Sequence, residues 1–211
     1  TPTPTASPTP TPSPTPTITP TPTPTVTRTT GIVPACYNVK LWIQSDTTNE
    51  SDTIVDSSDE AHSITAYETT SHETDGARSG FSDSAIKFDG NATKLVATST
   101  TTDFNWLRDS GESWTIEAWL SFDSLPTSGT YTILSQVRSP ADRGIWFAYL
   151  PSAGGGFTFN VGQSTSGTWS SGPRLWYPMV PATDTWYHVA IVNHSHEIKL
   201  YINGAMVASQ L

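Results

Sequence analysis

Apolar and polar residues alternate one by one between positions 114 and 122, and this spacing constrains the fold more than any other feature of the chain. The apolar set is Trp114, Ile116, Ala118, Leu120 and Phe122. Successive side chains of a β-strand point to opposite faces, so all five share one face of a strand. Runs with the same period lie at 145–150, 157–161 and 186–192. Because a helical period is almost absent, we expect an all-β fold whose apolar strand faces meet in one core.

A β-hairpin is predicted near the end of the chain. Asn203 and Gly204 stand between two strand-like runs at 199–202 and 205–208. Asparagine followed by glycine suits the two positive φ angles of a two-residue type I′ turn, because glycine has no Cβ and asparagine tolerates the left-handed region.

The first thirty residues hold ten prolines and fourteen threonines in near-strict alternation. Proline fixes φ and removes a backbone donor, and the segment offers almost nothing apolar to bury. We expect residues 1–34 to be an extended stalk or linker, which as polyproline II would reach roughly 75–90 Å. Residues 35–211 are then expected to form one globular domain.

The charge of this domain narrows the choice of partners. Beyond residue 30 the chain has nine basic and nineteen acidic residues, so its net charge is 9 − 19 = −10. The basic residues do not cluster, and nucleic-acid binding needs a Lys/Arg stripe. No apolar run approaches the length of about eighteen residues that a membrane-spanning helix needs. Neither nucleic acid nor a membrane span is expected.

Six short motifs follow one another between Val39 and Gln210. They are 39–41, which opens the first expected strand, Asp56-Ser57-Ser58 followed by His62, and the segments 84–90, 114–119, 186–190 and 200–204. Together they resemble the laminin-G-like domains of the concanavalin A-like lectin and glucanase superfamily, as found in bacterial surface proteins and bacteriophage structural or tail proteins. The resemblance implies a jelly-roll sandwich of two antiparallel sheets, with ligand sites in loops and on a concave side.

Members of this family normally continue into further strands after the Asn-Gly hairpin, whereas this sequence stops at Leu211. We therefore expect a sandwich that is truncated at its C-terminus. Its open strand edge or apolar face is expected to be covered by missing residues or by another chain.

A hydrolytic function is not expected. Concanavalin A-like glycoside hydrolases place two or three carboxylates at i, i+2 and i+4 on one strand face, so that one protonates the leaving oxygen and another attacks or activates water. Glu117 instead has Thr115 and Trp119 at these positions. We interpret Glu117 as a structural carboxylate that is hydrogen-bonded to nearby backbone or to His188. We therefore expect that the domain is not an enzyme.

Calcium is the one cofactor that the sequence suggests, and none is required. Nine of the nineteen acidic residues lie between Asp46 and Asp75, and calcium takes six to eight oxygen ligands. Asp56 and Asp89 are the candidate ligands, because the resemblance places both near a rim of the sandwich. The alternative is a solvated acidic loop that keeps the domain soluble.

The eight tryptophans suggest a second kind of site, because sugar-binding proteins stack pyranose rings on aromatic faces beside a few polar groups. Four of them stand in apolar runs and are expected in the core: Trp114, Trp119, Trp146 and Trp186. Trp169 instead lies in a Ser/Thr/Gly-rich loop with no other large apolar residue, and Arg174, Trp176 and Tyr177 follow it. We predict a sugar platform formed by these last four residues, with packing within the loop as the alternative.

The leading functional hypothesis is a non-catalytic recognition or adhesion domain. It would be displayed on the stalk outside a cell or on a virion surface, and would bind a glycan or glycoprotein surface. The second hypothesis is a structural module that packs against other copies of itself or an upstream domain in a fibre, tail or surface layer. The third, a glycoside hydrolase, lacks its carboxylate pair.

Overall fold

A computed structural model describes residues 38–78, 82–98, 104, 107, 112–125, 127–139, 142–151, 154–161 and 174–211, with the backbone alone at 137–139 and 142–143. Twelve β-strands lie in these ranges. They are β1 (Ser63–Tyr67), β2 (Ser71–Glu73), β3 (Ala85–Lys87), β4 (Lys94–Thr98), β5 (Trp114–Leu120), β6 (Tyr131–Ser139), β7 (Asp142–Leu150), β8 (Gly156–Val161), β9 (Arg174–Pro178), β10 (Tyr187–His194), β11 (Glu197–Ile202) and β12 (Ala205–Gln210).

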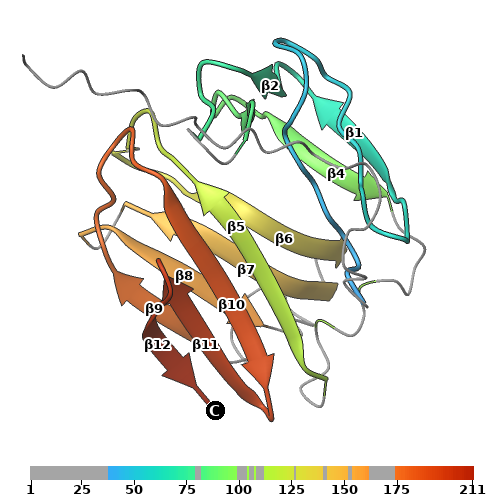
Figure 1. The fold of residues 1–211 in the computed structure, drawn as a ribbon. Coiled ribbons are helices and arrows are strands. Elements are labelled where there is room, and N and C mark those ends of the chain that lie inside the picture. The colour runs from blue at the N-terminus through green and yellow to red at the C-terminus, as the bar shows by residue number, and fades with distance from the viewer. Residues whose placement is uncertain are drawn as a thin grey trace, which may run out of the picture. The chain divides into compact units, whose positions relative to one another are not determined.

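Two antiparallel sheets of four strands form the body of the domain. One has the order β12-β11-β10-β5, and the other has the order β6-β7-β8-β9. Figure 1 shows them stacked face to face, with β5 and β10 in front of β6, β7 and β8. The predicted all-β sandwich of two antiparallel sheets is therefore confirmed.

The core lies between these two sheets. From the first sheet it receives Trp114, Val189, Ile191, Ile198, Leu200 and Ile202, and from the second Ile145, Phe147, Tyr149, Phe157, Phe159 and Leu175. Ile116 and Ala118 are half-buried against the same cluster. Period-2 alternation thus sorts the strands as expected, because each buried residue is two positions from the next on its own strand.

The predicted hairpin is present between β11 and β12. Ile202 pairs with Ala205, and the φ angles of Asn203 and Gly204 are 49° and 80°, as a type I′ turn requires. Asn203 is also held by side-chain bonding, because its Oδ1 accepts a hydrogen bond of 2.9 Å from the backbone N–H of His188.

The first strand expected at 39–41 is not formed, and that prediction is wrong. Only one bridging pair, Ile43 with Asp56, lies in this part of the described chain. The backbone N–H of Trp42 donates to the side chain of Asp56, and the carbonyl oxygen of Trp42 accepts from the backbone N–H of Ser57 at 2.7 Å. The described strands begin with β1 and β2, which pair with β4 and β3 in two small antiparallel sheets.

Residues Val39–Leu211 form one compact unit. The stalk expected at 1–34, and the domain boundary after it, lie outside the described residues. Within the described part of the chain, no helix is long and apolar enough to cross a membrane.

Candidate functional site on the outer face of the β6–β9 sheet

The outer face of the β6-β7-β8-β9 sheet carries two tryptophans and several polar side chains in two neighbouring rows. Strand pairing sets these rows. One row consists of Thr132, Ala148, Thr158 and Trp176, and the other of Ser135, Trp146, Asn160 and Arg174. These residues alternate along their strands with the core residues of the inner face, so they face away from the core. Arg174 is exposed, whereas Ala148, Thr158 and Asn160 are buried.

Trp176 is supported from below by a glycine. A Cβ at position 156 would lie only 2.5 Å from Cζ2 and 2.6 Å from Cη2 of Trp176. The six-membered ring of the indole therefore lies over the β8 backbone at Gly156, in space that any other residue would fill. The side chain keeps partial solvent exposure, which leaves part of an immobilised aromatic surface available for contact with a ligand.

Two buried polar side chains lie beside this ring. Thr158 is 0% exposed and Asn160 is 4% exposed. Thr158 Oγ1 donates to the carbonyl oxygen of Leu175 at 3.2 Å and accepts from Asn160 Nδ2 at 3.2 Å. Because buried polar groups need partners, this network fixes the positions of both side chains.

Trp146 lies on the outer face and not in the core, so the expectation of a core position for it is wrong. Its Nε1–H donates to Thr132 Oγ1 at 3.1 Å, and the side chain is half-buried. The inward positions of β7 are occupied by Ile145, Phe147 and Tyr149. Sequence reasoning treated 145–150 as one apolar run, whereas the alternation within it separates Trp146 from its neighbours.

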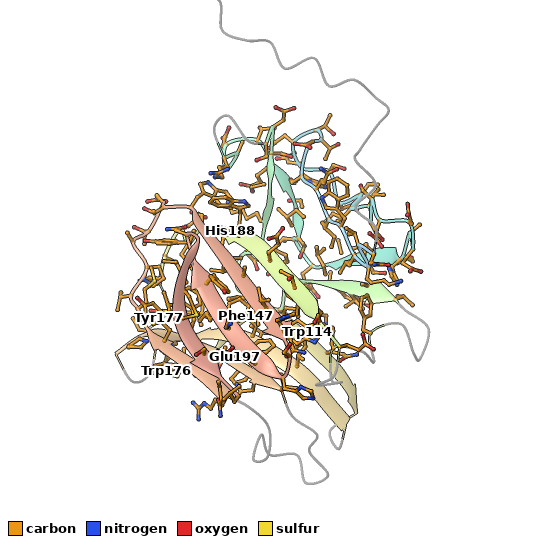
Figure 2. All side chains as sticks on the ribbon, turned by 60° about the horizontal axis from the view of Figure 1, so that its bottom comes forward. Trp114, Phe147, Trp176, Tyr177, His188 and Glu197 are labelled. Carbon is orange, nitrogen blue, oxygen red and sulfur yellow. The ribbon has the colours of Figure 1, made fainter. Side chains whose placement is uncertain are left out.

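The four residues of the predicted sugar platform are only partly brought together. Arg174 and Trp176 share the outer face of β9, and Arg174 is exposed. Tyr177 belongs to the other face and packs against the core cluster. Figure 2 shows Trp176 and Tyr177 on the same strand near the margin of the molecule. Trp169 lies outside the described residues, and the platform as a whole stays a prediction.

None of the described side chains on the outer face of this sheet is a carboxylate. At the outward positions, β7 presents Trp146, Ala148 and Leu150, and β8 presents Gly156, Thr158 and Asn160. A glycosidase needs two carboxylates on such a face. Among the described outward residues, Trp146 and Trp176 are half-buried and Arg174 is exposed.

A different cluster lies on the outer face of the opposite sheet, where Figure 2 marks His188 on β10. His188 Nε2 is 3.4 Å from Glu117 Oε2, and its ring lies 5.0 Å from the ring of Trp119. The guanidinium carbon of Arg78 is 3.5 Å from the centre of the Trp119 ring. Glu117 thus contacts His188, one of the two kinds of partner expected for it, but its side chain is 65% exposed. Trp119, expected in the core, is half-buried on this outer face.

Asp56 is one of the two candidate calcium ligands, and its carboxylate already accepts four hydrogen bonds. Oδ1 accepts from the backbone N–H groups of Trp42 and Ser58, both at 2.9 Å. Oδ2 accepts from the backbone N–H of His62 at 2.9 Å and contacts His62 Nδ1 at 2.8 Å. Burial by itself raises the pKa of Asp56, but these hydrogen bonds outweigh it and hold the pKa well below its ordinary value.

Asp89, the other candidate ligand, is exposed in the turn before β4. Its carboxylate accepts from the backbone N–H of Asn91 at 2.8 Å and from Thr69 Oγ1 at 2.7 Å. These bonds lower the pKa of Asp89. Among the described residues, no group of three or more His, Cys, Asp or Glu side chains is arranged to hold a metal ion. A calcium site at Asp56 and Asp89 stays a prediction.

The fold defines an all-β sandwich of two antiparallel sheets of the concanavalin A-like class. The chain belongs to the concanavalin A-like lectin/glucanases superfamily, because residues 89–210, more than half of its length, match the family model Laminin_G_3 that carries this description. The match begins at residue 89, so it covers a shorter stretch than the resemblance seen between residues 39 and 210. No curated protein matches the sequence.

Two solved structures are similar to this one. The crystal structure of a mutant of HCR/D superposes with a TM-score of 0.55 at 17% identity, over 81% of this chain and 38% of that chain. This chain therefore spans well under half of that protein. An S-layer domain-containing protein from Clostridium thermocellum gives a TM-score of 0.46 at 16% identity, over 81% of this chain and 71% of that chain. At such identities the likeness to HCR/D supports the fold alone.

Proposed function

We propose that this protein is a non-catalytic recognition domain that binds carbohydrate through the outer face of the β6–β9 sheet. The observation that carries the proposal is the support of the partly exposed Trp176 ring by Gly156, with the exposed side chain of Arg174 two positions away on the same face of β9. An aromatic surface with a few oriented polar groups is what a pyranose ring requires, because its apolar face stacks while its hydroxyls form hydrogen bonds.

Arg174 extends this site. It is exposed at the outward position next to Asn160, where its guanidinium offers several donors to sugar hydroxyls. Trp169 remains part of the proposed platform, since it precedes the first residue of β9 by only five positions in the sequence. Display on a Thr/Pro-rich stalk at a cell or virion surface is the setting we propose, since such a segment holds a domain away from its anchor.

A glycan array with the whole chain tests this proposal. Wild type is expected to bind a defined set of glycans, and Trp176→Ala to lose about tenfold in affinity with little change in thermal stability. Parallel arrays with calcium and with a chelator separate metal-dependent binding. Absence of binding by folded wild type to any glycan would refute the proposal.

A structural module is the second candidate, favoured by one observation. An apolar pocket opens between the two sheets beside β5 and β6, lined by residues that include Ile116, Ala118, Ile133 and Leu134. A partner chain that covered this opening would remove its apolar lining from water. Sedimentation of the whole chain tests this alternative: a stable, non-aggregating monomer would contradict it, and a defined oligomer that binds no glycan would support it.

A further inference from the structure

Arg174 is the one cationic side chain in the described part of the chain that has neither a carboxylate nor an aromatic ring as a partner. The other described lysines and arginines each have such a contact: Lys40 with Glu60, Lys87 with Glu73, Lys199 with Glu197, Lys94 with Tyr67 and Arg78 with Trp119. Beyond residue 30, nineteen acidic residues face nine basic ones. In a domain so rich in carboxylates, an arginine that pairs with none of the described ones keeps its charge available to a ligand.

The backbone of Arg174 is anchored although its side chain is exposed. Its N–H donates to Oε1 of Gln210 on β12 at 2.8 Å, and the residue pairs with Asn160 of β8. The side chain extends from this anchored position into solvent. A ligand therefore has to order only the arginine side chain and not the strand, which limits the entropic cost of binding.

Arg174 and Trp176 face the same side of β9 without obstructing each other. They are two positions apart, so with a rise of about 3.3 Å per residue their Cα atoms lie about 6.6 Å apart. The Trp176 ring lies over Gly156, which pairs with Pro178 at the far end of β9 from Arg174. The ring thus leans away from the arginine. A sugar stacked on the indole can present a substituent toward Arg174, and the long, flexible arginine side chain can reach it.

Both side chains offer hydrogen-bond donors and no acceptor. The guanidinium of Arg174 has five N–H donors, and the indole of Trp176 has one. Neither donates from its side chain to any residue that the structure describes. The described outward residues of this sheet also include no carboxylate. A surface with donors, a positive charge and no negative charge complements a ligand group that is anionic and can only accept.

Resting on the function proposed above, we propose that the ligand is an acidic saccharide. Its pyranose ring stacks on Trp176, and its anionic group, a uronate carboxylate or a sulfate ester, accepts hydrogen bonds from the guanidinium of Arg174. Both groups present neighbouring oxygens to the planar guanidinium fork. The net negative charge of the domain opposes an anion only at long range, because the screening length is about 8 Å at physiological ionic strength. The contact with Arg174 therefore decides the preference.

Calorimetric titration of the whole chain with matched pairs of sugars tests this inference. The pairs are methyl glucuronide and methyl glucoside, oligogalacturonate and its methyl ester, and a sulfated galactan oligosaccharide and its desulfated form. The acidic member of at least one pair is expected to bind about tenfold more tightly than its neutral partner. This preference is expected to shrink when the salt concentration rises from about 50 mM to about 500 mM. The uronate and sulfate pairs distinguish the two anionic groups.

Variants locate the preference. Arg174→Gln is expected to abolish it and leave binding of the neutral sugars unchanged, with a wild-type thermal melt. Arg174→Lys keeps the charge but loses the planar fork, and is expected to keep part of the preference. Trp176→Ala is expected to weaken binding of both members of a pair. The matched control is Lys199→Gln, which removes a cation that already pairs with Glu197 on the other sheet and is expected to leave all binding unchanged.

The possible failures are distinguishable. Equal affinity for the acidic and neutral members of every pair overturns the inference and leaves the proposed function standing. An acidic preference that survives Arg174→Gln also overturns it, because the anion then binds elsewhere. If the glycan array identifies only neutral glycans, the inference is again overturned alone. If no glycan binds at all, both proposals fail.

Discussion

The ring of Trp176 occupies the space that a side chain at Gly156 would fill. A Cβ there would meet ring carbons at 2.5 Å and the carbonyl oxygen of Tyr177 at 2.8 Å. Because the carbonyl belongs to the paired strand, it cannot move aside without disturbing the β8–β9 ladder. The glycine therefore makes both the strand pairing and the position of the indole possible.

Gly156→Ala is accordingly expected to cost about 1–3 kcal/mol in the free energy of unfolding, and also to displace Trp176 and weaken glycan binding. Urea denaturation and glycan titration measure the two effects. The matched control is Gly76→Ala, where the nearest atom lies at an ordinary 3.6 Å and stability is expected to change by about 0.5 kcal/mol or less. Equal effects of the two substitutions would contradict the packing argument.

Core and surface tryptophans are expected to respond differently to truncation. Trp114 is 6% exposed and belongs to the core cluster, so Trp114→Ala is expected to lower the free energy of unfolding by about 3–5 kcal/mol. Trp176→Ala is expected to lower the free energy of unfolding much less than Trp114→Ala does. It is expected to weaken glycan binding more than Trp114→Ala does. Thermal melts and titrations on both variants separate these effects, and a Trp176→Ala protein that unfolds would show that Trp176 is structural.

The Asp56 carboxylate is expected to make the domain sensitive to acid. Its hydrogen bonds to three backbone N–H groups and to His62 lower its pKa in the folded state. The folded protein thus binds the proton less readily than the unfolded chain, whose aspartates titrate near pH 3.9. The stabilisation is complete above that value and is lost as the pH falls through and below it.

Asp56→Asn is expected to lose about 2–4 kcal/mol of stability at pH 7 and to flatten the decline between about pH 5 and pH 2. Urea titrations across this range provide the measurement. An unchanged slope in the variant would assign the acid sensitivity to other carboxylates.

The Asn203 turn is expected to need its asparagine. Asn203→Ala removes the hydrogen bond to the His188 N–H and places a residue without a side-chain amide at φ 49°. A loss of about 1–2 kcal/mol follows. Asn203→Gly relieves the backbone strain and isolates the side-chain bond. If both variants have the same urea midpoint of unfolding as wild type, neither the asparagine side chain nor the turn conformation contributes measurably to stability.

Calcium binding at the exposed Asp89 predicts a ligand-dependent melt. If the ion binds there, millimolar calcium is expected to raise the Tm of wild type and to leave Asp89→Ala unchanged, because binding to the folded state alone stabilises it. Asp56 already accepts four hydrogen bonds and is expected to contribute nothing to that shift. A wild-type Tm that does not respond to calcium would contradict the prediction of a calcium site in this domain.

Local pattern by itself determined the strands of the sandwich and the final turn. Trp114, Val189 and Leu200 are buried because alternation places each of them on the apolar face of its strand, and burying that face removes it from water. Asn203 and Gly204 adopt positive φ because few other pairs tolerate it. Such properties depend on near neighbours in the chain, so the sequence contains them.

Tertiary structure decided which outward residues meet. Trp146 lies on β7 and Trp176 on β9, and both strands pair with β8. Nothing in the sequence around either tryptophan indicates that their strands share this partner. The hydrogen bond from the N–H of Trp42 to the buried Asp56 carboxylate, fourteen residues further on, is likewise not indicated by either local run. Register and long-range hydrogen bonds arise from how separate segments pack, and periodicity in one segment carries no information about the segment it will face.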